Sequence, residues 1–390
     1  MGGSSEGRPL AGLRVLDLSR LLPGPLATMI LADLGAEVDK LEDPKGGDYL
    51  RHMPPQAPDG MSAAFHLLNG SKRSLVLDLK QEEGRAAFLR LLPRYDVLIE
   101  SFRPGVLGRM GLSHEALLEA HPGLICAALS GYGQDGPMAQ RAGHDIGYLA
   151  RSGVLGLTGP QTGPPQVPGA QLADTGGALF ALIGILAGLR ERDRTGRGKV
   201  IDVSLCESAM IFGLFGLGQK LAGFELPRGA DVIMGGIAPY RTYATKDGQA
   251  VALGALEPKF WGAFCEGVGI ETDASALFPG PHQAEWMARL ERIFEARTRA
   301  EWEAFAAARD CCLEPVLDPL ELIDDPHHRA RRLFADKPIG ATILHQPRSP
   351  IAPSAEGEAP RQGQHSEAIL REAGFESAEI EALRSAGITR

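Results

Sequence analysis

Short apolar runs alternate with amphipathic stretches along the first half of the chain. A brief apolar run between turn formers is typical of a buried strand, and apolar residues three or four apart are typical of a helix. The predicted strands are 13–18, 36–42, 74–79, 96–100, 124–129 and 200–203, and the predicted helices are 26–34, 81–92 and 179–189. We expect the first helix to follow a chain break at Pro23-Gly24-Pro25 and to end at Gly35. The alternation predicts an α/β fold with a mostly parallel sheet covered by helices on both faces.

The pattern changes near residues 229–239, where regular periodicity is lost. Beyond them, strands are predicted at 240–243 and 249–253 and helices at 260–267, 283–297 and 299–308. We interpret residues 226–329 as a smaller α+β domain. Residues 10–225 and 330–390 then form the large domain, in which a connector rich in Pro, Gly and Ser at 347–364 leads to a last helical region at 366–383.

Composition narrows the classes of partner. The 390 residues carry a formal net charge of −9, which argues against nucleic acid because phosphate backbones are held by surplus Lys and Arg. The five cysteines form no C-x-x-C pair and have no His at zinc-ligand spacing, so we expect no metal and no redox cofactor, and a reducing cytoplasm. The Gly- and Ser-rich start does not resemble a signal peptide, and no uncharged apolar run reaches about 18 residues, so we expect no membrane segment.

His144 is the first candidate for chemistry. It lies in Arg141-Ala142-Gly143-His144-Asp145, shortly after the turn-rich segment 131–137 that follows a predicted strand. Ligands of parallel sheets bind beyond the carboxyl ends of the strands, and the pKa of imidazole lies near working pH. These features indicate a general base, although a surface or capping histidine would give the same local sequence.

Asp174 is the second candidate. It precedes the predicted helix at 179–189 and occupies the position expected of an N-cap. A plain cap is one interpretation. The other is functional, because free N–H groups at a helix start can hold a developing oxyanion, and Gly176 and Gly177 would let a substrate approach the backbone.

Further candidates are weaker when taken singly. Glu257 follows a predicted strand and precedes a helix, which also suits a cap or a surface charge. Cations near predicted strand ends could together hold the phosphates of a nucleotide-like cofactor, and they are Lys40, Lys72, Arg73, Arg103 and Arg109. Neither G-x-G-x-x-G after the first strand nor G-x-x-x-x-G-K-[ST] is present, which disfavours dinucleotide and P-loop nucleotide binding.

Several ordered motifs resemble those of the family III CoA transferase superfamily, which also contains the α-methylacyl-CoA racemases. The matching segments are 23–25, 31–36, 72–80, 102–105, 131–134, 194–198 and 363–367, and the similarity runs from about residue 10 to about residue 375. The resemblance implies a large Rossmann-like domain that binds coenzyme A as part of an acyl-CoA substrate. It also implies an interlocked homodimer with the active site near the interface between the large domain of one subunit and the small domain of the other.

The resemblance also implies roles for individual residues. The family aspartate corresponds to Asp174, the racemase histidine to His144, and the glutamate that supports it from the partner subunit to Glu257. Positions implied to bind coenzyme A are Lys40, Lys72, Ile99, Arg103, Arg109, Arg141, Ala142 and Gly143. Two features depart from the racemases: Lys40 stands where they have Arg, and the segment 46–65 is similar to the longer loop of the transferases.

Three functions remain open on these grounds. In the first, His144 and Asp174 move a proton on and off the α-carbon of a 2-methylacyl-CoA. In the second, Asp174 is the nucleophile of a CoA transferase, and the glycines near Gly235 cover the reactive intermediate. In the third, the chain binds acyl-CoA without catalysis.

Overall fold

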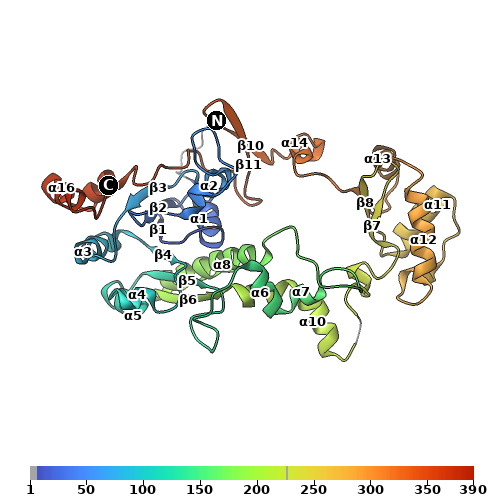
Figure 1. Cartoon of the computed structure of the whole chain (residues 1–390), viewed down its shortest axis with the longest axis horizontal. Coiled ribbons are helices and arrows are strands. Elements are labelled where there is room, and N and C mark those ends of the chain that lie inside the picture. Colours follow the sequence, from blue (N-terminus) through green and yellow to red (C-terminus); the bar gives the residue numbers. More distant parts are fainter. Residues whose placement is uncertain (1–6, 225–226) are drawn as a thin grey trace. The chain divides into compact units, whose positions relative to one another are not determined.

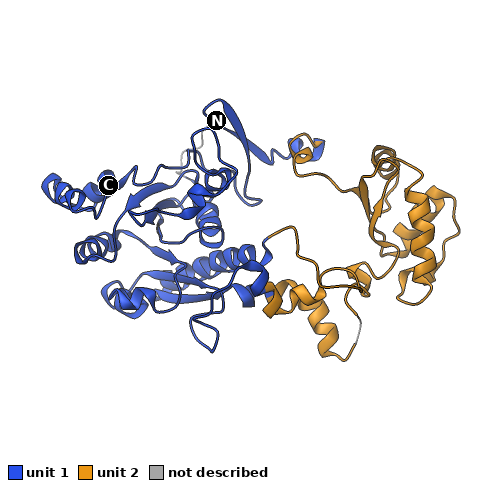
Figure 2. Cartoon of the chain, in the orientation of Figure 1, with its two compact units in different colours: residues 1–148, 171–209, 326–390 blue, residues 149–170, 210–325 orange. Residues whose placement is uncertain are grey.

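The computed structural model describes residues 7–224 and 227–390 and divides into two compact units. The first comprises residues 1–148, 171–209 and 326–390, and the second comprises 149–170 and 210–325 (Figure 2). The second unit therefore also includes 149–170 and 210–225, which the sequence pattern assigned to the large domain. Local packing explains the difference, because Arg228 Nε donates a hydrogen bond to Pro160 O at 2.8 Å and a side chain at Gly229 would meet Gly159 O.

A six-stranded parallel sheet forms the centre of the first unit (Figure 1). Its strands are β1 (Arg14–Asp17), β2 (Glu37–Glu42), β3 (Arg73–Val76), β4 (Val97–Glu100), β5 (Ile125–Ser130) and β6 (Lys199–Ser204). The spatial order β3-β2-β1-β4-β5-β6 is that of a Rossmann fold, with the topological switch point between β1 and β4. The expected α/β architecture is confirmed.

Alternate residues of each strand point into two separate hydrophobic cores. Val15 packs beneath α1 (Pro23–Asp33) and α8 (Leu172–Thr195) on one face of the sheet. The next residue, Leu16, belongs to the core of the opposite face. That second face is covered by α3 (Glu82–Leu91), α4 (Val106–Arg109), α5 (His114–Ala120), α15 (Ser366–Glu372) and α16 (Ser377–Ser385).

Helix α8 packs closely on the sheet where glycines face it. A side-chain carbon at Gly184 would lie 2.7 Å from Ile201 of β6, and one at Gly188 would lie 3.2 Å from Ile125 of β5. A side-chain carbon at Gly177 would meet Leu205, the residue after β6. The helix is longer at both ends than the 179–189 segment predicted from its apolar middle. Its length and composition would allow a membrane span, but half of its most apolar stretch is buried inside the protein, as in a core helix.

Three buried ion pairs fasten the loop after β2 to the end of the sheet. Lys40 Nζ lies 3.0 Å from Asp48, Lys72 Nζ 3.2 Å from Asp17, and Arg51 2.6 Å from Glu42. Burial alone would raise the pKa of Asp17, but Lys40 and Lys72 lower it to about 2. These cations are thus internal counter-ions for carboxylates.

Several segments were not expected or differ from expectation. Pro23-Gly24-Pro25 is the first turn of α1, because proline suits the first position of a helix and Gly24 leaves room for Ser19 Oγ. A hairpin of β10 (Phe334–Ile339) and β11 (Thr342–Pro347) has no sequence prediction. The remaining helices that lie wholly or partly in the first unit are α2 (Ala63–Asn69), α6 (Asp145–Ser152), α9 (Leu205–Phe212) and α14 (Pro326–Ala330).

The second unit is built on an antiparallel sheet of β7 (Tyr240–Ala244), β8 (Ala250–Gly254) and β9 (Leu313–Pro315). Its helices are α7 (Val154–Leu157), α10 (Leu214–Leu221), α11 (Pro258–Val268), α12 (Gln283–Phe294) and α13 (Arg299–Ala307). Stacked rings form the core, with Phe264 beside Trp261, Phe294 and Trp302. Bulky aromatic side chains supply much buried apolar surface for a small unit.

The turn between α8 and β6 offers a matched test of this packing. Gly196 has a φ of +70° with open space around it, whereas a side-chain carbon at Gly198 would lie 1.8 Å from Leu124 O. We expect Gly196→Ala to cost roughly 1 kcal/mol of unfolding free energy and Gly198→Ala more than about 3 kcal/mol. Urea unfolding of both variants measures the difference, and equal losses would contradict this account of the turn.

Candidate active site

A cavity of about 690 Å³ opens in the first unit, beyond the carboxyl ends of β1, β4 and β5. This is the switch point of the sheet, where adjacent strands carry their helices to opposite faces and leave a crevice. Its lining includes Leu18, Arg20, Ser101, Phe102, Arg103, Ser130, Gly131, Arg141, Ala142, Gly143, His144, Tyr148 and Asp174. The sheet topology thus brings together loops that lie far apart in the sequence.

His144 and Asp174 both line this cavity. His144 is exposed and immediately precedes α6, whereas Asp174 is half-buried in the first turn of α8. The two groups influence each other electrostatically, and His144 acts to lower the pKa of Asp174. The arrangement presents an imidazole and a carboxyl group to one space.

The environment of Asp174 favours its protonated form. Burial and the neighbouring Asp145 carboxylate together raise its pKa from 3.8 to about 6, and His144 opposes them only partly. A carboxyl group with this pKa has both protonation states populated close to neutral pH. It can therefore both accept and deliver a proton.

Asp145 caps α8 from a distant part of the chain. Its Oδ1 accepts hydrogen bonds from the backbone N–H of Ala173 at 2.8 Å and of Asp174 at 3.0 Å. Two expectations are corrected by this contact. The N-cap residue is Gln171 and not Asp174, and these two N–H groups are occupied and not free to hold an oxyanion.

Tyr148 sets the shape of the wall that carries His144. A side-chain carbon at Gly131 would lie 2.4 Å from the Tyr148 ring, and one at Gly143 would lie 2.5 Å from it. Tyr132 packs edge-on against the same ring, with centroids 5.2 Å apart. Glycine is required on both sides of the ring because any larger residue would displace the loop that leads to His144.

Only some of the residues expected to bind coenzyme A line the cavity. Arg103, Arg141, Ala142 and Gly143 line the cavity. Lys40, Lys72 and Ile99 are buried in the protein interior, at 0%, 2% and 0% exposure, so in this structure none of their side chains can contact a phosphate group. Arg109 is exposed at the end of α4 and is not part of the cavity lining, and Arg73 pairs with Asp39 and Glu372.

Sequence reasoning missed Arg20, which lines the cavity directly after β1 and lies over the Phe102 ring at 5.7 Å. The argument applied to the other cations also covers it, because Arg20 lies three residues after the last residue of a predominantly buried strand. With Arg103 and Arg141, it gives the cavity three guanidinium groups suited to phosphate or carboxylate.

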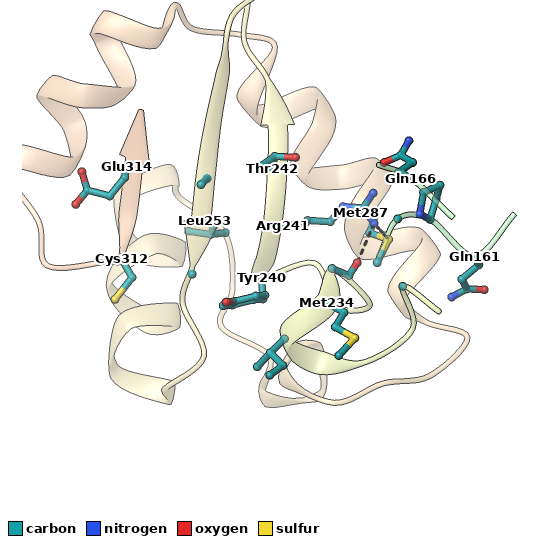
Figure 3. Close-up of a pocket in the computed structure, with 17 residues that line it drawn as sticks. Gln161, Gln166, Met234, Tyr240, Arg241, Thr242, Leu253, Met287, Cys312 and Glu314 are labelled. Atoms are coloured by element: carbon teal, nitrogen blue, oxygen red, sulfur yellow. Dashed lines mark hydrogen bonds between the residues drawn. The ribbon is translucent and has the colours of Figure 1, made fainter. Parts of the chain in front are cut away.

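Glu257 belongs to the second unit, where it is the N-cap residue of α11 without a side-chain capping bond. Its charge contributes to raising the pKa of Cys312. Cys312 lines a separate cavity of about 860 Å³ within this unit, together with Met234, Tyr240, Arg241, Leu253 and Met287 (Figure 3). Arg241 also donates a hydrogen bond at 3.4 Å to the carbonyl oxygen of Gly235, one of the glycines singled out in the sequence (Figure 3).

A family model described as CoA-transferase family III matches residues 10–366. The chain belongs to this family. Alpha-methylacyl-CoA racemase of Homo sapiens is 38% identical over 390 residues, with 96% of each chain covered. Succinyl-CoA:glutarate CoA-transferase of Homo sapiens is 31% identical, with 98% of this chain and 90% of the relative covered. The crystal structure of a CAIB/BAIF family protein from Brucella suis has a TM-score of 0.81 at 31% identity, covering 94% of this chain and 99% of the other.

Membership of the family makes the protein an enzyme of the CoA-transferase and racemase type, with a CoA thioester as substrate. Within residues 7–224 and 227–390, no group of three or more His, Cys, Asp or Glu side chains could hold a metal ion.

The stability of the Asp174→Asn variant tests whether the pKa of Asp174 is raised in the folded protein. Because the folded pKa of about 6 exceeds 3.8, ionising Asp174 penalises the fold, and the penalty is full above pH 6 and disappears as pH falls towards 4. Asparagine stays neutral, so we expect a gain of roughly 1–2 kcal/mol at pH 7.5, discounted for partial exposure, and none at pH 4. Thermal unfolding at both pH values measures it, with Asp135→Asn on the exposed loop as the unaffected control. A loss of stability at pH 7.5 would contradict the assignment.

Proposed function

We propose that the protein interconverts the two configurations at C2 of 2-methylacyl-CoA thioesters by transferring a proton through an enolate. The observation that carries the proposal is the environment of Asp174. This carboxyl group lines the same cavity as His144 and has a pKa raised to about 6 by burial and by Asp145. A pair that holds one proton between two groups suits a reaction that removes a proton from one face and returns one to the other.

The proton transfers balance without any other reactant. For one enantiomer, neutral His144 takes the α-proton while the electron pair of the C–H bond moves towards the thioester oxygen. Protonated Asp174 then delivers its proton to the opposite face of the same carbon. For the other enantiomer the two groups exchange roles, so that Asp174 takes the α-proton and protonated His144 delivers one. Each turnover therefore moves the proton held by the pair from one of these two groups to the other.

Coenzyme A would be bound by the cations at the mouth of this cavity. Arg20, Arg103 and Arg141 offer planar guanidinium groups that suit its phosphates. The buried Lys40 and Lys72 have an indirect part in this proposal, because their ion pairs fix the loops around the cavity. The racemase relative, at 38% identity, supports the acyl-CoA substrate and the reaction.

We also propose a homodimer in which Glu257 of the partner subunit supports His144. Large apolar side chains are exposed near the end of α9 and along α10, among them Phe212 at 51%, Phe215 at 62% and Leu221 at 80%. Such a patch is typical of a surface covered by another chain. None of the five cysteines, all of which lie in the described part of the chain, forms a disulfide, which supports a cytoplasmic location.

A CoA transferase is the second candidate, and the loop at 46–65 favours it. In that reaction Asp174 attacks the thioester as an ionised carboxylate. The same raised pKa that suits a proton carrier keeps part of the nucleophile protonated near pH 6, so transfer would increase as pH rises through that value.

Deuterium uptake distinguishes the two reactions. We expect the protein in heavy water to place deuterium at C2 of a 2-methylacyl-CoA and to form both configurations without any free acid as acceptor. Mass spectrometry and chiral analysis of the released acid measure both results. A protein that moves CoA to a free carboxylic acid and yields Asp174 modified by hydroxylamine, with no deuterium at C2, would be a transferase.

Asp145→Asn tests how the carboxyl pair is tuned. The variant keeps an oxygen that can accept the α8 hydrogen bonds but loses the charge that raises the pKa of Asp174. The active form holds one proton between the two groups, so the acid limb of the rate profile marks its loss when both become protonated. We therefore expect the acid limb of kcat/KM to move to lower pH, by up to about one pH unit. An unchanged or upward-shifted limb would contradict this role of Asp145.

A further inference from the structure

Removal of an α-proton puts negative charge on the thioester oxygen, and this charge needs a hydrogen-bond donor. Two N–H groups at the start of α8, those of Ala173 and Asp174, cannot donate this hydrogen bond because they already bind Asp145 Oδ1. An enolate oxygen left without a donor in a half-closed cavity would be costly. A hydroxyl group in the lining can supply such a donor.

Ser130 has the features of such a donor. It is the last residue of β5, is 7% exposed, and lines the cavity together with His144 and Asp174. Its Oγ is buried and has no hydrogen-bond partner among the residues that the structure describes. A buried hydroxyl without a partner costs about 1–3 kcal/mol, and in native proteins such groups are few and often functional.

The backbone around Ser130 is held firmly. Ser130 pairs in register with Ser204 of β6, and the following residue, Gly131, accepts a hydrogen bond from the N–H of Cys206 at 3.0 Å. The Tyr148 ring lies against Gly131 from the cavity side. A donor on a rigid strand end needs little reorganisation when charge develops, and only χ1 and the rotation of the hydroxyl hydrogen about Cβ–Oγ remain to aim it.

We propose that the Ser130 hydroxyl donates a hydrogen bond to the carbonyl oxygen of the bound thioester and stabilises the enolate. The inference rests on the proposed racemisation and adds a catalytic residue to it. As the base takes the α-proton, the C–H electron pair forms the C1–C2 double bond and the carbonyl pair moves to oxygen. Ser130 keeps its own proton throughout, and its hydrogen bond strengthens as the oxygen becomes negative.

Ser130→Ala removes the donor, and Ser62→Ala is its matched control. Ser62 is also fully buried, precedes a helix without capping it, and has an Oγ without a partner among the described residues, but it does not line the cavity. We expect Ser130→Ala to lower kcat for deuterium exchange at C2 about 100-fold with KM changed less than about threefold. Ser62→Ala should keep wild-type exchange, and neither variant should unfold at a lower temperature, since each loses an unsatisfied hydroxyl.

Binding of acetoacetyl-CoA gives a readout that does not need turnover. Its enolate absorbs in the near ultraviolet, so the absorbance of the bound compound measures how strongly the site favours an enolate. We expect the enolate fraction to be high on the wild type and on Ser62→Ala, and to fall about tenfold or more on Ser130→Ala at equal occupancy. Ser130→Cys, whose thiol is a weak donor, should lie between them.

The outcomes separate this inference from the proposed function. If the wild type exchanges deuterium at C2 and Ser130→Ala does so equally well, the role of Ser130 is wrong and the racemisation stands. If the wild type exchanges nothing, the racemisation is wrong, and an equal enolate fraction on wild type and Ser130→Ala would overturn the role of Ser130 as well. Should the alanine variant fail to fold, the thiol variant makes the same comparison.

Discussion

The contact between Asp145 and the start of α8 is the interaction on which the site depends. One carboxylate oxygen holds two backbone N–H groups of the helix that carries Asp174, and its charge lies beside the Asp174 carboxyl group. The contact fixes the position of the carboxyl, and the charge of Asp145 adds to the effect of burial in raising its pKa. Because Asp145 follows His144 directly, it also ties the histidine loop to the helix. One side chain thus holds the carboxyl group in place and contributes to its protonation.

This contact requires α8 to lie close to the sheet, and small residues make that possible. Gly177 and Gly184 leave space that Leu205 and Ile201 fill. In the cavity wall, Gly131 and Gly143 leave space for the ring of Tyr148. The cavity is therefore shaped as much by missing side chains as by the groups that line it.

The strands of the large sheet were predicted well from the sequence. Each is a short apolar run, and successive parallel strands must be joined by a crossover connection, which is usually a helix. The sequence also predicted His144 and Asp174 as a pair through the family resemblance, and the sheet topology brings both to one cavity. It could not predict the true start of α8, since the cap comes from Asp145, 27 residues before the first helical residue. Local pattern contains no information about such a distant partner.

The cations expected to bind coenzyme A show the same limit of prediction from sequence. Lys40 and Lys72 lie at the expected positions near strand ends, but buried carboxylates turn them inward, and a charge count cannot reveal this. Ser130 carried no signal in the sequence, because its importance comes only from being buried beside a cavity without a partner. The hairpin of β10 and β11 was missed because its exposed residues lack a regular apolar alternation.

In the proposed racemisation, the imidazole and the carboxyl group face opposite sides of one carbon atom. Stereospecific exchange by single variants in heavy water is the sharpest test of this geometry. We expect His144→Ala and Asp174→Asn both to lose interconversion, yet each should still exchange the C2 proton of one enantiomer, and the two variants should act on opposite enantiomers. Exchange of the same enantiomer by both variants, or full interconversion by either, would contradict it.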